Sequence, residues 1–211
     1  MQNEPGGAQH GWEQQDWEAL AWEKQGGLLP AIIQDADSRR VLMLGYMSRE
    51  ALATTLRTRQ VTFFSRSKGR LWTKGESSGH TLDLVAIEAD CDRDSLLVLA
   101  RPQGPTCHLG TASCFSAAPG DVLGELQALI HRRHAERPAG SYTTKLFDDG
   151  IKRIAQKVGE EGLETALAAV AEDDASLLGE TADLLYHLIV LLRARGLDLD
   201  DAKRVLQERM R

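Results

Sequence analysis

The sequence has few cysteines and few aromatic residues, and it lacks a secretory signal. Of its 211 residues, 5% are aromatic and three are cysteines. An odd number of cysteines without a signal argues against a disulfide framework and favours a reducing, cytoplasmic location. The first twenty residues show neither the basic segment nor the apolar segment of a secretory signal. Secreted, disulfide-stabilised scaffolds are therefore excluded from the expected classes.

Long apolar runs and a surplus of basic residues are also lacking. We expect no apolar run to approach the length of a membrane span, so no membrane partner is predicted. The formal net charge is -6, and the chain has no long basic block. Nucleic-acid-binding domains usually carry a clustered positive charge, so a nucleic-acid partner is not expected. The acidity would instead suit sites that bind divalent cations.

The two halves of the chain differ in composition, which predicts two domains. Residues 1–118 hold all three cysteines and all four tryptophans, whereas residues 119–211 are rich in Ala, Leu and Glu. Short strand-like runs separated by Gly, Ser and Asp predict a β-rich (α+β) first domain. Helix-period apolar patterns predict an all-α bundle in the second. The expected divisions are a disordered tail over 1–16, a β-rich domain over 17–116, a linker over 117–121 and a helical domain over 122–211.

Local patterns place the individual elements. Two apolar runs flank the turn residues 35–38, which predicts a hairpin. Ser48 precedes an apolar i, i+4 pair, so it is expected to be the N-cap of a short helix. A last helix should be capped by Asp198 or Asp200. Further strands are expected over 61–65, 70–75, 81–90 and 95–102, and four helices over 122–137, 148–172, 176–196 and 198–210.

All three cysteines lie within residues 90–115. Cys91, Cys107 and Cys114 are separated by 16 and then 7 positions, which is not the CxxC spacing of a structural zinc site. Three thiolates would leave the fourth tetrahedral position of zinc open, as in catalytic sites. His108, beside Cys107, is the candidate proton carrier. The alternative is that these cysteines are small buried hydrophobic residues.

Three aspartates alternate with other residues around Cys91. If they lie on a strand, Asp90, Asp92 and Asp94 would share one face and Cys91 would lie on the other. Three carboxylates on one face repel one another, and a bound Mg²⁺ would remove that repulsion. The alternative is that the aspartates edge a solvated turn. The pattern favours a magnesium site beside the zinc site.

A basic stretch over residues 63–80 mixes arginine and lysine with serine, glycine and one tryptophan. Guanidinium groups and glycine amides suit phosphate, and an indole ring can stack on a base. The GxxxxGK[ST] spacing of a Walker A loop is absent. An exposed basic hairpin is the alternative. The candidate substrate-binding residues here are Arg66, Ser67, Arg70, Trp72 and Lys74.

Carboxylates recur at helical spacing in the second half. Three lie at i, i+1 and i+4 of one expected helix, and two lie at i and i+3 of the next. Both sets border apolar stripes, where acids are costly unless they are paired or bound to metal. Two facing helices could gather them around Mg²⁺, with Lys157 as a candidate for substrate phosphate and Glu161 as the catalytic candidate. A solvated helix face is the alternative. The carboxylates are Glu160, Glu161, Glu164, Glu180 and Asp183.

These motifs together resemble a known family. The runs "LMLGYM", "TFFSRSKGRLWTKGESSG", "DCDRD" and "GPTCHLGTASCF" are similar to phosphoribosyl-AMP cyclohydrolase. The runs "SYTTKLFDDGIKRIAQKVGEEGLETALAA" and "ETADLLYHLIVLL" are similar to phosphoribosyl-ATP pyrophosphatase. From about Trp22 onward, the chain resembles the bifunctional histidine-biosynthesis enzymes that join the two. One departure is His80, where many relatives have Asn.

The resemblance implies a function for each half. The helical half, of the MazG-like all-α type, would use Mg²⁺ to hydrolyse phosphoribosyl-ATP to phosphoribosyl-AMP and pyrophosphate. The β-rich half would open the N1–C6 bond of phosphoribosyl-AMP by zinc-assisted hydrolysis. The resemblance also implies a homodimer whose zinc ligands come from both subunits. The implied ligands are Cys91, Cys107 and Cys114 for zinc, with Asp90, Asp92 and Asp94 for magnesium in the first half and the five carboxylates in the second.

Two rival interpretations come from other classes. One is a zinc deaminase fused to a general nucleotide pyrophosphatase, but the H-x-E…P-C-x-x-C signature of such deaminases is absent. The other is a zinc-stabilised binding module with a helical dimerisation domain. That module would need a closed zinc site with a fourth protein ligand, and it would show no turnover.

Overall fold

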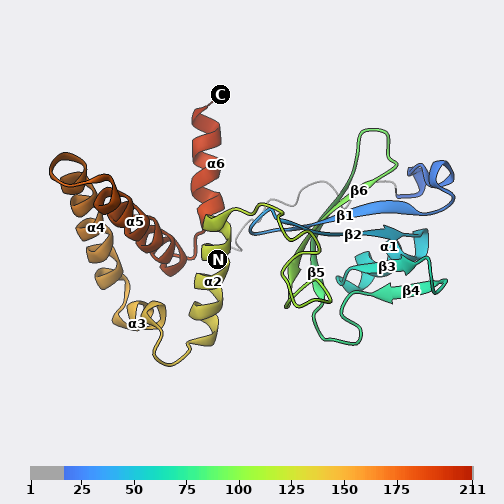
Figure 1. Cartoon of the computed structure of the whole chain (residues 1–211), viewed down its shortest axis with the longest axis horizontal. Helices are drawn as coiled ribbons and strands as arrows, with labels where there is room; N and C mark the ends of the chain where they lie inside the picture. The colour runs from blue at the N-terminus through green and yellow to red at the C-terminus, as the bar shows by residue number, and fades with distance from the viewer. Residues whose placement is uncertain (1–16, 211) are drawn as a thin grey trace, which may run out of the picture. The chain divides into compact units, whose positions relative to one another are not determined.

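The structure is a computed structural model that describes residues 17–210, apart from the side chain of Gln25. The chain divides after Asp121 into two compact units, the strand-rich unit and the helical unit (Figure 1). The expected strand-rich first part and helical second part are confirmed. The disordered tail predicted over 1–16 lies outside the described residues.

A four-stranded mixed sheet forms the framework of the strand-rich unit. Its order is β2-β1-β6-β5, in which β1 and β6 run parallel and the other neighbouring pairs are antiparallel. Strands β3 and β4 form a separate hairpin. The predicted hairpin and the four further strands are confirmed. The strands are β1 (Leu29–Asp35), β2 (Val41–Met47), β3 (Thr62–Ser65), β4 (Arg70–Thr73), β5 (Leu82–Ala89) and β6 (Leu96–Pro102).

The α-helix of this unit packs mainly against the β3–β4 hairpin, and two short 3-10 helices precede β1. In α1 (Arg49–Thr58), the Ser48 hydroxyl accepts the N–H of Ala51 at 3.2 Å, so the predicted N-cap is confirmed. The 3-10 helices are η2 (Trp17–Ala19) and η3 (Trp22–Gln25). Trp22 is buried in the same core as alternate residues of β1, which gives the first segment a fixed place on the unit.

The helical unit holds five α-helices within the described residues, one more than expected. The additional helix begins after Ser141, whose hydroxyl accepts the N–H of Thr144, and it ends at Gly150 with φ 85°. Of the two expected caps of the last helix, Asp198 is the one used, in a capping box with Asp201. The helices are α2 (Val122–Glu136), α3 (Tyr142–Asp149), α4 (Ile151–Ala171), α5 (Asp174–Ala194) and α6 (Leu199–Arg209).

Helices α4 and α5 lie side by side as an antiparallel pair and form the largest helix packing of this unit (Figure 1). A buried cluster that includes Ile130, Ile154 and Ile189 joins α2, α4 and α5. The two helices that carry the acidic motifs are therefore held against each other by a common core.

By length and composition alone, α5 could cross a membrane, since it has 21 residues and its most apolar 18-residue stretch has a mean hydropathy of 1.4. The expectation that no apolar run approaches a membrane span is therefore wrong. Only 17% of that stretch is buried within the protein. The helix also carries Glu180 and Asp183 and packs along α4. Because charged residues are costly in a bilayer, we interpret α5 as a bundle helix with an exposed apolar face.

Candidate active sites

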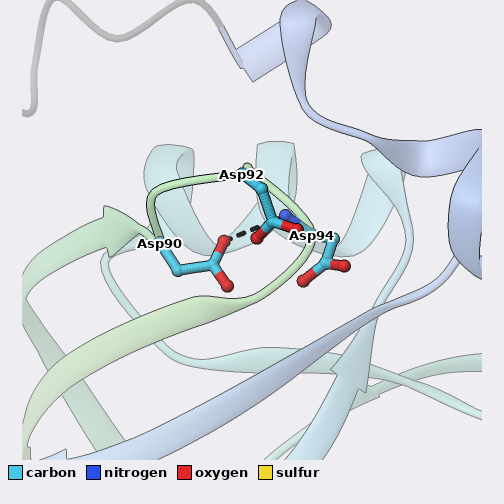
Figure 2. A group of neighbouring side chains, drawn as sticks. All are labelled: Asp90, Asp92 and Asp94. Carbon is cyan, nitrogen blue, oxygen red and sulfur yellow. Dashed lines mark hydrogen bonds between the residues drawn. The ribbon is translucent and has the colours of Figure 1, made fainter.

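The three aspartates of the first acidic motif lie in the turn between β5 and β6, where Arg93 has φ 60°. Oxygens of Asp90, Asp92 and Asp94 lie within 4.8 Å of one another (Figure 2). The expectation that strand alternation gathers them is wrong, because a tight turn does so. Hard carboxylate oxygens at this separation are a suitable ligand set for Mg²⁺.

Neighbouring groups stabilise the ionised form of this cluster. The carboxylate of Asp90 accepts the hydroxyl of Ser95 and the backbone N–H groups of Asp94 and Ser95. These bonds, the Ser95 hydroxyl first, lower the pKa of Asp90 below its ordinary value. The ammonium of Lys24 lies 2.5 Å from carboxylate oxygens of both Asp92 and Asp94. Lys24 was not predicted, because it lies 68 residues away from Asp92.

Two of the three cysteines meet in a pocket of about 460 Å³ that follows β6. The Cys107 thiol lies 3.8 Å from Nδ1 of His108. Backbone donation from Leu109, first of several causes, lowers the pKa of Cys107, whereas burial raises the pKa of Cys114. The backbone N–H of Cys114 donates to the carbonyl of Leu42 at 2.8 Å, which fixes this loop against β2. The pocket therefore holds a thiol pair with a histidine beside it.

Cys91 lies at the other end of the sheet. It stands in the turn before β6, whereas Cys107 follows the end of β6. Six residue steps along β6 correspond to roughly 20 Å. Among residues 17–210, the groups of three or more metal-ligating side chains are the aspartates and a glutamate group, and neither contains a cysteine. Within one chain, the three predicted zinc ligands do not come together.

The predicted substrate-binding residues of the basic stretch divide into two sets. Trp72 and Lys74 line the thiol pocket. Arg66 stacks over the ring of Tyr46, at 3.8 Å from the guanidinium carbon to the ring centroid. Arg70 pairs with Glu76 at 2.6 Å, and the Ser67 hydroxyl lies 3.5 Å from that of Ser65. The pocket lining also includes His80, to which no role was assigned from sequence.

The second acidic site lies between α4 and α5. Oxygens of Glu161, Glu164 and Glu180 lie within 4.8 Å of one another, and Glu161 is only 5% exposed. The ammonium of Lys157 lies 2.6 Å from Glu161 and 2.9 Å from Glu160. These two carboxylates raise the pKa of Lys157. Glu160 was expected in the same cluster, but it lies outside this group of three.

Asp183 also lies outside the group of three, but its negative charge acts on Glu180, a member of the group. Partial burial, followed by the charges of Glu164, Glu161 and Asp183, raises the pKa of Glu180. Three acids held this close repel one another. The site would therefore gain stability from a divalent cation.

A buried histidine that sequence reasoning missed adjoins the glutamates. His187 is 4% exposed, and its Nδ1 lies 2.8 Å from the carbonyl of Asp183, so this nitrogen carries the proton. Its Nε2 lies 3.3 Å from the Tyr142 hydroxyl, which donates to it. Nδ1 also lies 3.7 Å from Glu161. The i, i+4 spacing of Asp183 and His187 was the available sequence signal.

Comparisons with known proteins agree with this division. Residues 43–116 match the family model described as "Phosphoribosyl-AMP cyclohydrolase", and residues 123–210 match "Phosphoribosyl-ATP pyrophosphohydrolase". A protein of Xanthomonas campestris pv. campestris named "Histidine biosynthesis bifunctional protein HisIE" is 70% identical over 91% of this chain and 93% of its own length. The chain belongs to this bifunctional family. The resemblance drawn from the motifs is confirmed, and the chain is a bifunctional hydrolase of histidine biosynthesis.

The family similarity extends to more distant relatives. Proteins of the same name from Shewanella oneidensis and Bacteroides thetaiotaomicron are 59% and 53% identical. The matches cover 88% and 90% of this chain and 89% and 95% of the relatives. Both units of the bifunctional family are thus present in this chain.

Proposed function

We propose that each unit performs one metal-assisted hydrolysis, the helical unit on phosphoribosyl-ATP and the strand-rich unit on phosphoribosyl-AMP. The observation that carries this proposal is that the two matched family regions hold chemically different sets of candidate ligands. The cyclohydrolase region contains the thiol pocket and the aspartate turn, and the pyrophosphohydrolase region contains the glutamate group.

In the helical unit, water attacks a phosphorus atom of the α–β phosphoanhydride and the bridging P–O bond breaks, which releases pyrophosphate. Glu161, Glu164 and Glu180 would hold Mg²⁺, which when bound neutralises the charge of the polyphosphate. Glu161 would orient the attacking water, and its burial and its contact with Lys157 support this role. Lys157 is the candidate for contact with a substrate phosphate. The acidic pair of antiparallel helices supports the MazG-like type of fold.

In the strand-rich unit, water adds at C6 of the purine and the N1–C6 bond opens, which gives the phosphoribosylformimino-AICAR-phosphate product. Cys107 and Cys114 would hold zinc, which when bound lowers the pKa of a water molecule. A lowered pKa of the Cys107 thiol favours the thiolate that zinc requires. His108 is the candidate for moving the proton, and Trp72 and Lys74 for binding base and phosphate.

The position of Cys91 supports a homodimer with a shared zinc site. Because Cys91 precedes β6 and Cys107 follows it, at opposite ends of a strand of roughly 20 Å, a three-thiol site requires Cys91 of a second subunit. Exposed apolar residues lie in register across three strands near that end, since Ile32 pairs with both Leu44 and Leu97. Ile32 and Leu97 also line a pocket with Cys91. Such a stripe is typical of a surface buried between identical subunits.

The helical unit presents a second apolar face. Leu163, Leu167 and Val170 of α4 are exposed at helical spacing, and Val170 is 82% exposed. Leu178 of α5 is exposed as well. We propose that both units contact their counterparts in the dimer. The free cysteines, two of them exposed, fit a reducing cytoplasm.

A mass-spectrometric time course with phosphoribosyl-ATP, zinc and Mg²⁺ tests the chemistry. Wild type should release pyrophosphate, and phosphoribosyl-AMP should then gain the mass of one water. Cys114→Ser should stop at phosphoribosyl-AMP, and Glu161→Gln should leave phosphoribosyl-ATP intact. A loss of ammonia would instead favour the deaminase. No turnover with both metals loaded would favour the binding module.

The dimer has its own test. Ile32→Asp places a charge in the apolar stripe, so it should lower both the dimer fraction and the zinc content. Ala53→Asp, at an exposed position of α1 outside the stripe, adds the same charge and is the matched control. Sedimentation and metal analysis of both variants check this. Full zinc content in a monomeric Ile32→Asp protein would refute the shared site.

A further inference from the structure

Lys24 occupies the position on the aspartate turn that a divalent cation would need. Its ammonium lies 2.5 Å from Oδ2 of Asp92 and 2.5 Å from Oδ2 of Asp94. Those two oxygens belong to the group within 4.8 Å that could hold a metal ion. Both oxygens of Asp90 are already used by the turn, so Asp92 and Asp94 are the carboxylates most open to a cation.

The chain segment that carries Lys24 is docked on the same turn. The backbone N–H of Ala21 donates to the carbonyl of Arg93 at 2.8 Å. Trp22 is 2% exposed, and its indole N–H donates to the carbonyl of Trp17 at 3.0 Å. Lys24 is thus presented to the turn by an anchored 3-10 helix, although its own side chain is half-exposed.

An ammonium and a divalent ion cannot share these oxygens. Mg²⁺ requires oxygens at about 2.0–2.1 Å, and a second cation bound to the same carboxylates would repel it strongly. A metal ion that binds here must therefore move Lys24 away. The measured affinity for the metal would then equal the intrinsic affinity multiplied by the fraction of molecules in which Lys24 has left the turn.

We propose that Lys24 is a displaceable counter-ion of the aspartate turn, which a divalent cation must remove before it binds. It rests on one prediction, that Asp90, Asp92 and Asp94 of the cyclohydrolase region form a magnesium site. Metal binding would then loosen one tie between the 17–25 segment and the turn. The alternative is that Lys24 stays near the bound metal and neutralises surplus carboxylate charge. In that case, removing the ammonium would weaken metal binding, whereas displacement predicts that its removal strengthens it.

Mn²⁺ titration of the full-length, zinc-loaded protein, followed by the electron paramagnetic resonance signal of free Mn²⁺, tests this. Asp92→Asn identifies which binding class belongs to the turn. Lys24→Met removes the ammonium but keeps the length of the side chain. Arg57→Met, an exposed residue of α1, is the control for an equal charge change in the same unit.

Lys24→Met should bind Mn²⁺ at the turn roughly three- to tenfold more tightly than wild type, as expected for removing two exposed ion pairs. Arg57→Met should bind like wild type. An unchanged or weaker affinity in Lys24→Met would overturn the proposal while leaving the metal site in place. If Asp92→Asn removes no binding class, the turn is not a metal site. This inference and the predicted magnesium site then fail, whereas the glutamate and zinc sites of the proposed function are unaffected.

Hydrogen exchange provides a second, independent measurement. Saturating Mg²⁺ should increase amide exchange in the 17–25 segment of wild type, because one of its ties to the turn is lost. The same addition should change exchange much less in Lys24→Met. Slower exchange of the segment when metal is added to wild type would contradict displacement.

Discussion

The two acidic sites hold similar groups in different ways. The aspartate turn is local, since the six consecutive residues 90–95 and the hydrogen bonds among them gather its carboxylates. The glutamate site exists only where α4 packs against α5, and its central acid is buried. Each site holds a lysine, Lys24 from a distant segment and Lys157 from one turn earlier on the same helix. A turn can therefore keep its geometry when a core is disturbed, whereas a site between helices cannot.

The largest expected effect separates the two sites by activity. Glu164→Gln removes one of three ligand groups from the glutamate site, and pyrophosphate release should fall by about 100-fold or more. Ring opening of supplied phosphoribosyl-AMP should not change. Steady-state assays of each step check this, with Glu208→Gln at an exposed position of α6 as the control. A parallel fall in ring opening would show that the sites are coupled.

A glycine in the strand-rich unit allows the next test. A Cβ on Gly45 would overlap the ring of Phe63, which stacks on Trp72 of the pocket wall. Gly45→Ala should lower the free energy of unfolding of this unit by about 1–3 kcal/mol, as overpacking does. All four tryptophans precede residue 73, so their fluorescence reports this unit during denaturation. An unchanged midpoint would mean that Phe63 moves without cost.

A smaller loss of stability is expected from a change at the hydrogen bond to His187, beside the glutamates. Tyr142→Phe removes the donor to Nε2 of His187 and should cost the helical unit about 0.5–1.5 kcal/mol. Circular dichroism at 222 nm during denaturation follows this unit. Tyr186→Phe, which loses the bond to the Thr143 hydroxyl instead, provides the comparison. If only Tyr142→Phe also weakens Mn²⁺ binding, His187 positions the metal-binding acids.

The smallest expected effect is a difference in pH response. The pKa of Asp90 is lowered, so its contribution to stability is present above the ordinary carboxyl value and is lost as pH falls through its own lower pKa. The pKa of Glu180 is raised, so the folded helical unit binds its proton first and gains stability as pH falls toward 4.5. Thermal unfolding without metal, followed by fluorescence and by circular dichroism, should therefore show opposite trends. Similar trends in both signals would contradict the two assignments.

Features set by neighbouring residues could be predicted from the sequence. The Ser48 cap, the β1–β2 hairpin and the long helices follow from short patterns, and the structure contains them. Helix α3 was missed because it has only eight residues, and because the next helix was expected to begin at residue 148, before Gly150. The aspartates were predicted to cluster, but on a strand and not in a turn.

Features that depend on the topology could not be read from spacing. Nothing local to Lys24 indicates a partner 68 residues away, and this contact exists because the first segment docks on the β5–β6 turn. The separation of Cys91 from Cys107 likewise depends on both lying at the ends of one strand, β6. Likewise, the pairing of Tyr142 with His187 depends on how α3 packs near α5.

The length of β6 has a genetic consequence if the zinc site is shared. A chain with Cys91→Ser and a chain with Cys107→Ser would each form dimers in which every site lacks a thiol. In a mixed dimer, one site would combine Cys107 and Cys114 of the first chain with Cys91 of the second, and the other site would keep a single thiol. Two alleles that each fail to support growth without histidine would then restore it together. A seven-residue strand would thereby make two defective copies of the gene complement each other.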